Sequence, residues 1–315
     1  MRADFIFTDA PLPSCHASSV VEAKPGAFLA AWFGGTDEGA KDVAIWMARS
    51  TEKGWTPPQK IADEPGFPCW NPVLFRERSG ALFLFYKAGP SPTNWSGLYR
   101  TSNDAGQTWN PAVLLPAGLL GPIKNKPIQL ASGRIVAGTS VESHRTWAAW
   151  VETSDDAGKT WRRHGPITVP SDNYGIIQPT IFESSAGTLR MLTRARPRIG
   201  QVCTATSKDS GTTWTDAEPT KLPNPNSGID AVRLADGRVV LCHNPTHTGR
   251  TPLILSVSKD DGSTWQAGKT LESEAGEYSY PAIIQASSGD VHVTYTWKRT
   301  RIRHWVLTPD ECEQA

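Results

Sequence analysis

The chain has no long hydrophobic run and almost no excess of charge. No apolar stretch approaches the ~18 residues that a membrane-spanning helix needs, so a transmembrane helix is not expected. The 32 basic and 31 acidic side chains leave a formal net charge of +1. This balance gives no reason to expect a nucleic acid or an acidic membrane surface as a partner. Linkers, low-complexity segments and helical periodicity are missing as well.

Cysteine is scarce and does not follow a ligand pattern. The five cysteines are odd in number and lack metal-binding spacing, so we expect reduced thiols, no metal and no cofactor. The first nine residues contain no apolar core of a secretion signal. Together these features predict a cytoplasmic protein.

A nine-residue signature is present in four copies. They are 101–109 (TSNDAGQTW), 153–161 (TSDDAGKTW), 206–214 (TSKDSGTTW) and 257–265 (VSKDDGSTW), with a worn copy at 49–55 (RSTEKGW). The leading serines (Ser50, Ser102, Ser154, Ser207 and Ser258) are 52, 52, 53 and 51 residues apart. Asp and Gly suit a tight turn, and the Trp can pack between units. So regular a period predicts a repeat architecture.

A second recurrence lies between these signatures. It is an apolar pair of short strands around a glycine turn, as in 71–84 and 178–189, and it occurs six times. Four-stranded units of ~40–50 residues are typical of propeller blades. The sequence therefore predicts an all-β, six-bladed propeller that forms one domain over residues 1–315, with residues 5–7 as an outer strand that closes the ring.

Polar residues stand where the innermost strands should begin. In a propeller these strands line the central channel. A core built for packing alone would not place ionisable groups there, because buried charge is costly unless it is paired. The pattern thus predicts a site for a polar ligand, formed by His16, Asn71, Lys124, Lys126, Gln178, Asp230, Glu277 and Tyr278. Weaker candidates near strand ends are Arg196, Arg198, Asn224, Asn226, Lys298 and Arg299.

The Ser-x-Asp-x-Gly-x-Thr-Trp box on six units resembles the sialidase superfamily of Asp-box glycosidases. In that family three arginines hold one carboxylate, and a glutamate activates a tyrosine nucleophile. The resemblance places two of the arginines at Arg194 and Arg250, and the tyrosine at Tyr278, in a Tyr-Ser pair. It places His16 where the first arginine is expected and Gln178 where the glutamate is expected.

These two departures change the expected chemistry. A neutral Gln178 cannot act as a base, so the tyrosine needs another activator. His16 is one candidate, since histidine titrates near neutral pH. The family keeps its acid/base aspartate in a loop that corresponds to residues 37–42, after Gly34-Gly35, and this loop contains Asp37, Glu38 and Asp42. The spacing does not choose among these three, and Glu277 beside Tyr278 is a further partner.

Three functions are compatible with these residues. The first is a glycoside hydrolase that releases a terminal sialic, uronic or related keto-sugar from an acidic glycan. The second is a uronate lyase, in which a His/Tyr pair removes the proton beside a carboxylate that the arginines neutralise. The third is a propeller that binds acidic oligosaccharides without turnover. An unsaturated product that absorbs ultraviolet light would separate the second function from the first.

Overall fold

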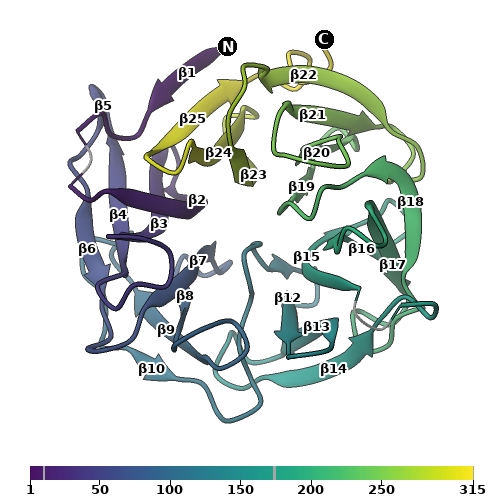
Figure 1. The fold of residues 1–315 in the computed structure, drawn as a ribbon, viewed down its shortest axis with the longest axis horizontal. Coiled ribbons are helices and arrows are strands. Elements are labelled where there is room, and N and C mark those ends of the chain that lie inside the picture. Colours follow the sequence, from purple (N-terminus) through teal and green to yellow (C-terminus); the bar gives the residue numbers. More distant parts are fainter. Residues whose placement is uncertain (10, 173–174, 315) are drawn as a thin grey trace.

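The computed structural model describes residues 1–9, 11–172 and 175–314, and within them all 25 elements are strands. They form six antiparallel sheets arranged around a centre (Figure 1). The prediction of an all-β, six-bladed propeller is confirmed. None of the described residues belongs to a helix that is long and apolar enough to cross a membrane.

Each blade uses consecutive strands, except at the closure of the ring. Blade 1 contains β2 (Ser14–Lys24), β3 (Ala27–Gly35), β4 (Ala44–Thr51), β5 (Gly54–Trp55) and β6 (Gln59–Ala62). Blade 2 contains β7 (Cys69–Arg76), β8 (Leu82–Ala88), β9 (Ser96–Ser102) and β10 (Val113–Leu114). Blade 3 contains β11 (Ile128–Gln129), β12 (Ile135–Glu142), β13 (Trp147–Ser154) and β14 (Arg162–Ile167).

The second half of the ring repeats this order. Blade 4 contains β15 (Ile176–Glu183), β16 (Leu189–Ala195), β17 (Gln201–Ser207) and β18 (Glu218–Pro223). Blade 5 contains β19 (Asp230–Arg233), β20 (Val239–His243), β21 (Leu253–Ser258) and β22 (Gln266–Glu272). Blade 6 contains β23 (Tyr278–Gln285), β24 (Val291–Trp297), β25 (Arg301–Leu307) and, as its outer strand, β1 (Arg2–Phe5). The predicted closing strand thus exists, a few residues earlier than expected.

The repeated signatures form the turns between the third and fourth strands of blades 2 to 5. In the first of them Ser102 donates a hydrogen bond of 2.7 Å to Asp104, and Thr108 donates to the same carboxylate through its amide and its hydroxyl. Ala105 and Gly106 both have positive φ, 57° and 77°, and glycine adopts that conformation without strain. The other three boxes repeat these bonds. The box is therefore a rigid turn on the outer part of each blade.

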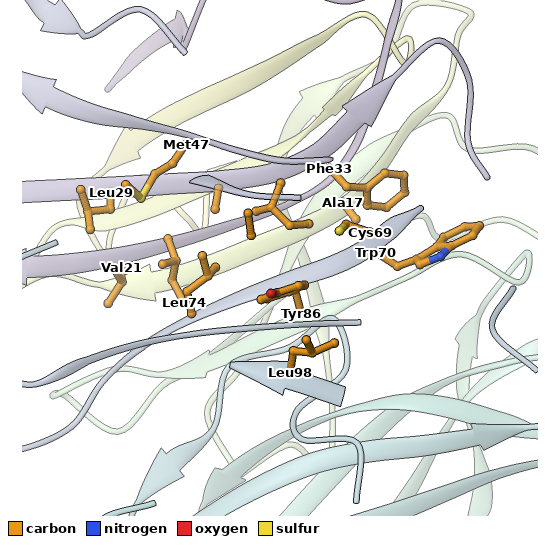
Figure 2. Close-up of a cluster of buried hydrophobic side chains, with 14 of the residues drawn as sticks. Ala17, Val21, Leu29, Phe33, Met47, Cys69, Trp70, Leu74, Tyr86 and Leu98 are labelled. Carbon is orange, nitrogen blue, oxygen red and sulfur yellow. The ribbon is translucent and has the colours of Figure 1, made fainter. Parts of the chain in front are cut away.

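The core lies between neighbouring sheets. Figure 2 shows the cluster between blades 1 and 2, where Leu29 and Met47 face Leu74 and Tyr86. All five tryptophans of the signatures and their worn copy pack against such clusters from outside; they are Trp55, Trp109, Trp161, Trp214 and Trp265. Because neighbouring sheets pack through their apolar faces, the blades converge at the ends of their innermost strands.

Candidate functional site

The innermost strands share a bulge that faces the channel. In β2, β7, β15 and β23 the pairing register shifts at the same place, and one residue has a positive φ. These residues are Ala17 (55°), Asn71 (42°), Gln178 (56°) and Tyr280 (53°). All but Ala17 precede a proline. Bulges and left-handed backbone in non-glycine residues concentrate at functional sites, where they redirect side chains. The fold thus presents equivalent positions from several blades to one centre.

Arg194 on β16 binds two of these positions. Its Nη1 donates to the Tyr280 hydroxyl at 2.5 Å and to Gln178 Oε1 at 3.2 Å. Its Nε and Nη2 donate to Asn226 Oδ1 at 3.0 and 2.7 Å. Arg194 is only 5% exposed, and none of the described carboxylates lies within ion-pair distance of it. A buried cation with neutral partners alone is unfavourable, so this arginine can accept an anion.

A second arginine faces the same tyrosine from blade 5. The guanidinium carbons of Arg194 and Arg250 each lie 5.5 Å from the ring centroid of Tyr280. Arg250 Nη1 donates to Glu277 Oε1 at 2.7 Å, and Arg299 Nε donates to the same oxygen at 2.9 Å. Arg299 also pairs with Glu38. An alternating chain of charges therefore links Arg250 to the loop that contains the three predicted carboxylates.

His16 contacts the same tyrosine ring. Its ring centroid is 4.2 Å from that of Tyr280 and 5.7 Å from that of Phe33. The side chain is buried, and its Nδ1 has no hydrogen-bond partner among the described residues. Burial, and then the charges of Arg299, Arg250, Arg194 and Lys124, hold the pKa of His16 well below its usual value. The imidazole is therefore neutral at neutral pH.

Lys124 fixes the backbone around Tyr280. Its Nζ donates to Asn125 Oδ1 and the Ile229 carbonyl, both at 2.9 Å, and to the Pro281 carbonyl. Burial lowers the pKa of Lys124 to about 7, whereas three oxygen acceptors are the arrangement of a protonated ammonium group. The side chain thus joins blades 3, 5 and 6 directly behind the tyrosine.

Lys126 and Asp230 bind each other across the channel. Lys126 Nζ lies 3.1 and 3.0 Å from the two carboxylate oxygens of Asp230. Asp230 also accepts from the Thr180 hydroxyl at 2.7 Å and the Ile283 amide at 2.9 Å. Lys126 lines two grooves with Gln285, one of which also includes Ile128, and neither groove is lined by Arg194 or Tyr280. These two predicted substrate-binding residues hold blades together through bonds that leave Asp230 1% exposed.

The structure brings Tyr280, and not Tyr278, to Arg194. Tyr278 is fully buried in the apolar cluster of blades 5 and 6, and its hydroxyl has no partner among the described residues. Side chains two residues apart would share a face in a regular strand, but the bulge at Tyr280 breaks that alternation. A sequence signal for Tyr280 exists: the pair Tyr280-Pro281 matches Gln178-Pro179 and Asn71-Pro72.

The three carboxylates in the loop between β3 and β4 have different hydrogen-bond and ion-pair partners. Asp42 accepts from the Thr36 hydroxyl at 2.6 Å and from its amide at 3.0 Å, and the hydroxyl bond holds the pKa of Asp42 below its usual value. Glu38 pairs with Arg299. The side-chain carboxylate of Asp37 accepts only the Glu38 amide, at 2.8 Å, among the described residues. Of the three, Asp37 is the exposed carboxylate whose oxygens are least engaged.

The protein-family comparison identifies the chain. Residues 26–293 match the model of the BNR repeat-like domain. The chain belongs to this family. It is a divergent member of the sialidase superfamily, as the signature boxes predicted. Among the described residues of this BNR repeat-like chain, no group of three or more His, Cys, Asp or Glu side chains could hold a metal ion.

The relatives are distant in sequence and close in fold. A sialidase of Micromonospora viridifaciens is 25% identical over 278 residues, which cover 80% of this chain and 42% of that protein. The crystal structure of a protein of unknown function from Dyadobacter fermentans superposes with a TM-score of 0.81 at 19% identity, covering 97% of each chain. An intramolecular trans-sialidase from Ruminococcus gnavus, in complex with oseltamivir carboxylate, gives 0.78 at 13% identity, with 99% and 98% covered. The BNR repeat-like chain spans about two fifths of the length of the curated relatives it matches.

One polar residue at the rim of the site could not be predicted from the sequence, because it belongs to no motif. Glu142 ends β12 opposite Trp147 in the pairing register. The Trp147 ring lies 4.1 Å from the Arg196 guanidinium carbon and 5.7 Å from that of Arg194. Burial raises the pKa of Glu142, and Arg194 and Arg196 oppose that shift. No repeat or family pattern points to this carboxyl, so only the pairing of β12 with β13 brings it to the site.

Proposed function

We propose that this chain is a glycoside hydrolase that releases a terminal acidic sugar, of the sialic, uronic or related keto-sugar class, from a glycan. One observation carries the proposal. Arg194 is 5% exposed and binds the phenol of Tyr280, and no carboxylate of the described residues lies within ion-pair distance of it. A carboxylate on the sugar would supply the missing negative charge, and Arg250, whose guanidinium carbon lies 5.5 Å from the same tyrosine ring, would share it.

The tyrosine has the role that the resemblance gave to Tyr278. We propose that Tyr280 Oη faces the anomeric carbon and either attacks it or stabilises its developing positive charge. Donation from Arg194 lowers the cost of negative charge on the phenol oxygen, because a cationic donor binds an anion more strongly than a neutral group. Arg194 cannot take up the phenolic proton. When the phenol attacks, that proton would pass to the neutral imidazole of His16, whose ring centroid lies 4.2 Å from that of Tyr280. Lys124 holds the backbone after Tyr280 and fixes its direction.

Asp37 is the proposed acid/base. As a carboxylic acid it would protonate the glycosidic oxygen while the bond to the anomeric carbon breaks. As a carboxylate it would then remove a proton from the water that attacks the same carbon. Asp37 is exposed and carries no ion pair among the described residues, whereas Glu38 and Asp42 are engaged within the protein. The Arg299–Glu38 pair would hold the loop against the site.

The test is a panel of fluorogenic glycosides of sialic acid, of other keto-acid sugars and of glucuronic acid. We expect turnover of at least one acidic glycoside, no turnover of the matching neutral glycosides, and loss of most activity in Tyr280→Phe. Tyr278→Phe is the matched control and should retain activity, since its hydroxyl makes no hydrogen bond among the described residues. Activity lost in Tyr278→Phe and kept in Tyr280→Phe would refute the assignment.

A lyase is the second candidate, and His16 is the observation that favours it. A neutral imidazole with an unpartnered Nδ1, in ring contact with a tyrosine, could accept the proton beside a uronate carboxylate. The C–H electrons would then form the double bond as the neighbouring C–O bond breaks. An unsaturated product that absorbs ultraviolet light would establish this reaction and exclude hydrolysis. Saturable binding of acidic sugars without any product would instead support a binding propeller.

A further inference from the structure

In blades 2 to 5 the box turn fills the gap to the preceding blade. The glycine of each box approaches that neighbour so closely that a side-chain carbon in its place would collide. The distances from such a carbon are 2.5 Å to Leu29 for Gly106, 2.9 Å to Phe83 for Gly158, 3.0 Å to Val136 for Gly211 and 2.9 Å to Phe182 for Gly262. Contacts this short leave no space for another molecule between these blades.

Blade 1 lacks this filling. Its worn signature is two residues shorter than the others, and β4 and β5 pair Ser50 with Trp55 and Thr51 with Gly54 around a tight turn. A side-chain carbon on Gly54 would have nothing within 4 Å. The neighbour that a complete box would reach is blade 6, on which His292 stands three residues after the turn Gly289. Leu29, Phe83 and Val136 stand three residues after the corresponding glycines.

A groove of about 790 Å³ lies at this seam. Residues 2–9, with β1, form one wall, residues 50–58, with β5, form the other, and His292 and His304 line it from β24 and β25. Figure 1 shows β5 and β1 on neighbouring parts of the ring's outer edge. The groove is therefore on the outside of the ring and separate from the Arg194 cluster. We call it the seam groove.

The lining offers aromatic rings and neutral hydrogen-bonding groups. Phe28 stacks on His292 at 4.0 Å, and Trp55 meets His304 edge-on at 5.2 Å. His292 Nδ1 and His304 Nε2 share a hydrogen bond of 3.0 Å. Burial lowers the pKa of His292 to about 4 and that of His304 to about 3. Because each neutral ring has one N–H and one lone pair, the two outer nitrogens are one donor and one acceptor.

The charges around the groove have mixed signs. Arg2 and Asp4 pair at 3.1 Å, and the other charged residues of the lining are Asp9, Glu52 and Lys53. No single sign dominates, so a strongly charged ligand has no advantage. Aromatic faces together with a paired donor and acceptor match a ring that has an apolar face and hydroxyl groups at its edge. That is the chemistry of a neutral sugar.

We propose that the seam groove binds a neutral sugar ring of the glycan, as a second carbohydrate site away from the channel. The choice of a glycan rests on the proposed function, whereas the missing box and the groove do not. Binding there would hold a polymeric or branched substrate to the protein between turnovers and raise its local concentration at the channel. Small acidic glycosides would not need the site.

The experiment measures binding of galactose, lactose and N-acetyllactosamine to the full chain by ligand-observed NMR and calorimetry. We expect saturable binding to the wild type and at least about tenfold weaker binding to Trp55→Ala. Phe67→Ala is the matched control, an exposed aromatic outside the groove, and should bind as the wild type does.

A second variant replaces residues 50–55 by the complete box of residues 258–265. We expect the restored turn to fill the groove, abolish neutral-sugar binding and raise the melting temperature. Turnover of small acidic glycosides should remain unchanged, so a failure of this proposal is distinguishable from a failure of the proposed function. The proposal is overturned if none of the three sugars binds, or if binding persists after the box is restored.

Discussion

Replacing Arg194 should separate stability from function more clearly than any other change in this chain. The perturbation is Arg194→Met, which keeps the unbranched aliphatic stem and removes the charge. Two opposing effects act on the folded state. The variant leaves Asn226 Oδ1, which now accepts two bonds at 3.0 and 2.7 Å, without its donor, at a cost of about 1–3 kcal/mol. It also removes a cation that is 5% exposed and has no carboxylate of the described residues within ion-pair distance.

The second effect should be at least as large as the first. Desolvation of a buried charge costs several kcal/mol even after relaxation. We therefore expect the melting temperature of Arg194→Met to equal or exceed that of the wild type. Activity should move in the opposite direction. Loss of two charge-assisted hydrogen bonds, to the substrate carboxylate and to Tyr280, removes about 4 kcal/mol of transition-state stabilisation, or roughly 10³-fold in kcat/KM.

The assay combines thermal unfolding, with and without an acidic sugar, and steady-state turnover. The wild type should unfold at a higher temperature when the sugar is present, and Arg194→Met should show no such shift. Arg134→Met is the matched control: this arginine pairs with Asp155 at 2.6 Å near the box turns, so its loss should lower stability slightly and preserve turnover. An Arg194→Met protein that unfolds earlier than the wild type and still responds to the sugar would refute the reasoning.

Three further predictions concern the box, the lost base and pH. Asp209→Ala should lower the free energy of unfolding by about 1–3 kcal/mol, because Ser207 and Thr213 lose their acceptor, while kcat is unchanged; a fully folded but inactive variant would contradict this. Gln178→Glu should give Arg194 a counterion and thereby raise the melting temperature. For a hydrolase, the new carboxylate should also raise kcat by about 10²-fold; unaltered kinetics would argue against Tyr280 as the reacting group. Burial lowers the pKa of His243 to about 4, so between pH 6.5 and 4 the unfolded chain binds a proton at this residue that the folded chain does not. His243 alone should therefore lower the free energy of unfolding by about 1.6 kcal/mol from pH 6.5 to 5, in addition to the loss from the other buried histidines. Chemical denaturation across this range should show a shallower pH slope for His243→Gln.

The fold could be predicted from the sequence because most blades repeat the same turn with the same local hydrogen bonds. The leading serines keep a spacing close to 52 residues, and the serine and aspartate of every box make the same bonds in the structure. A local motif with its own hydrogen bonds is predictable, since no distant part of the chain is needed to complete it. The short, worn copy in blade 1 gave no sign of a groove, because the groove depends on what blade 6 presents across the seam.

The site was harder to predict for two physical reasons. A strand's alternation shows which side chains share a face, but the bulge at Tyr280 changes that alternation locally, and the Tyr-Ser pattern pointed to Tyr278. Residue type also cannot show whether a charge is already satisfied. The sequence predicted that Lys126 and Asp230 bind a ligand, yet they bind each other across the channel. The two residues are 104 positions apart in the chain, so their contact depends on how blades 3 and 5 are placed.

The closure of the ring affects the order in which the protein can be made. β1 is the outer strand of the last blade, and among the described residues β25 is its one sheet partner. During synthesis the backbone donors and acceptors of β1 stay without this partner until β25 has left the ribosome, while blades 1 to 5 can each form from consecutive residues. During this delay β1 remains an unpaired strand, and other nascent chains can pair with it and aggregate. A circular permutant that begins at β2 and ends with β1 after β25 should therefore fold faster from the same sequence and aggregate less.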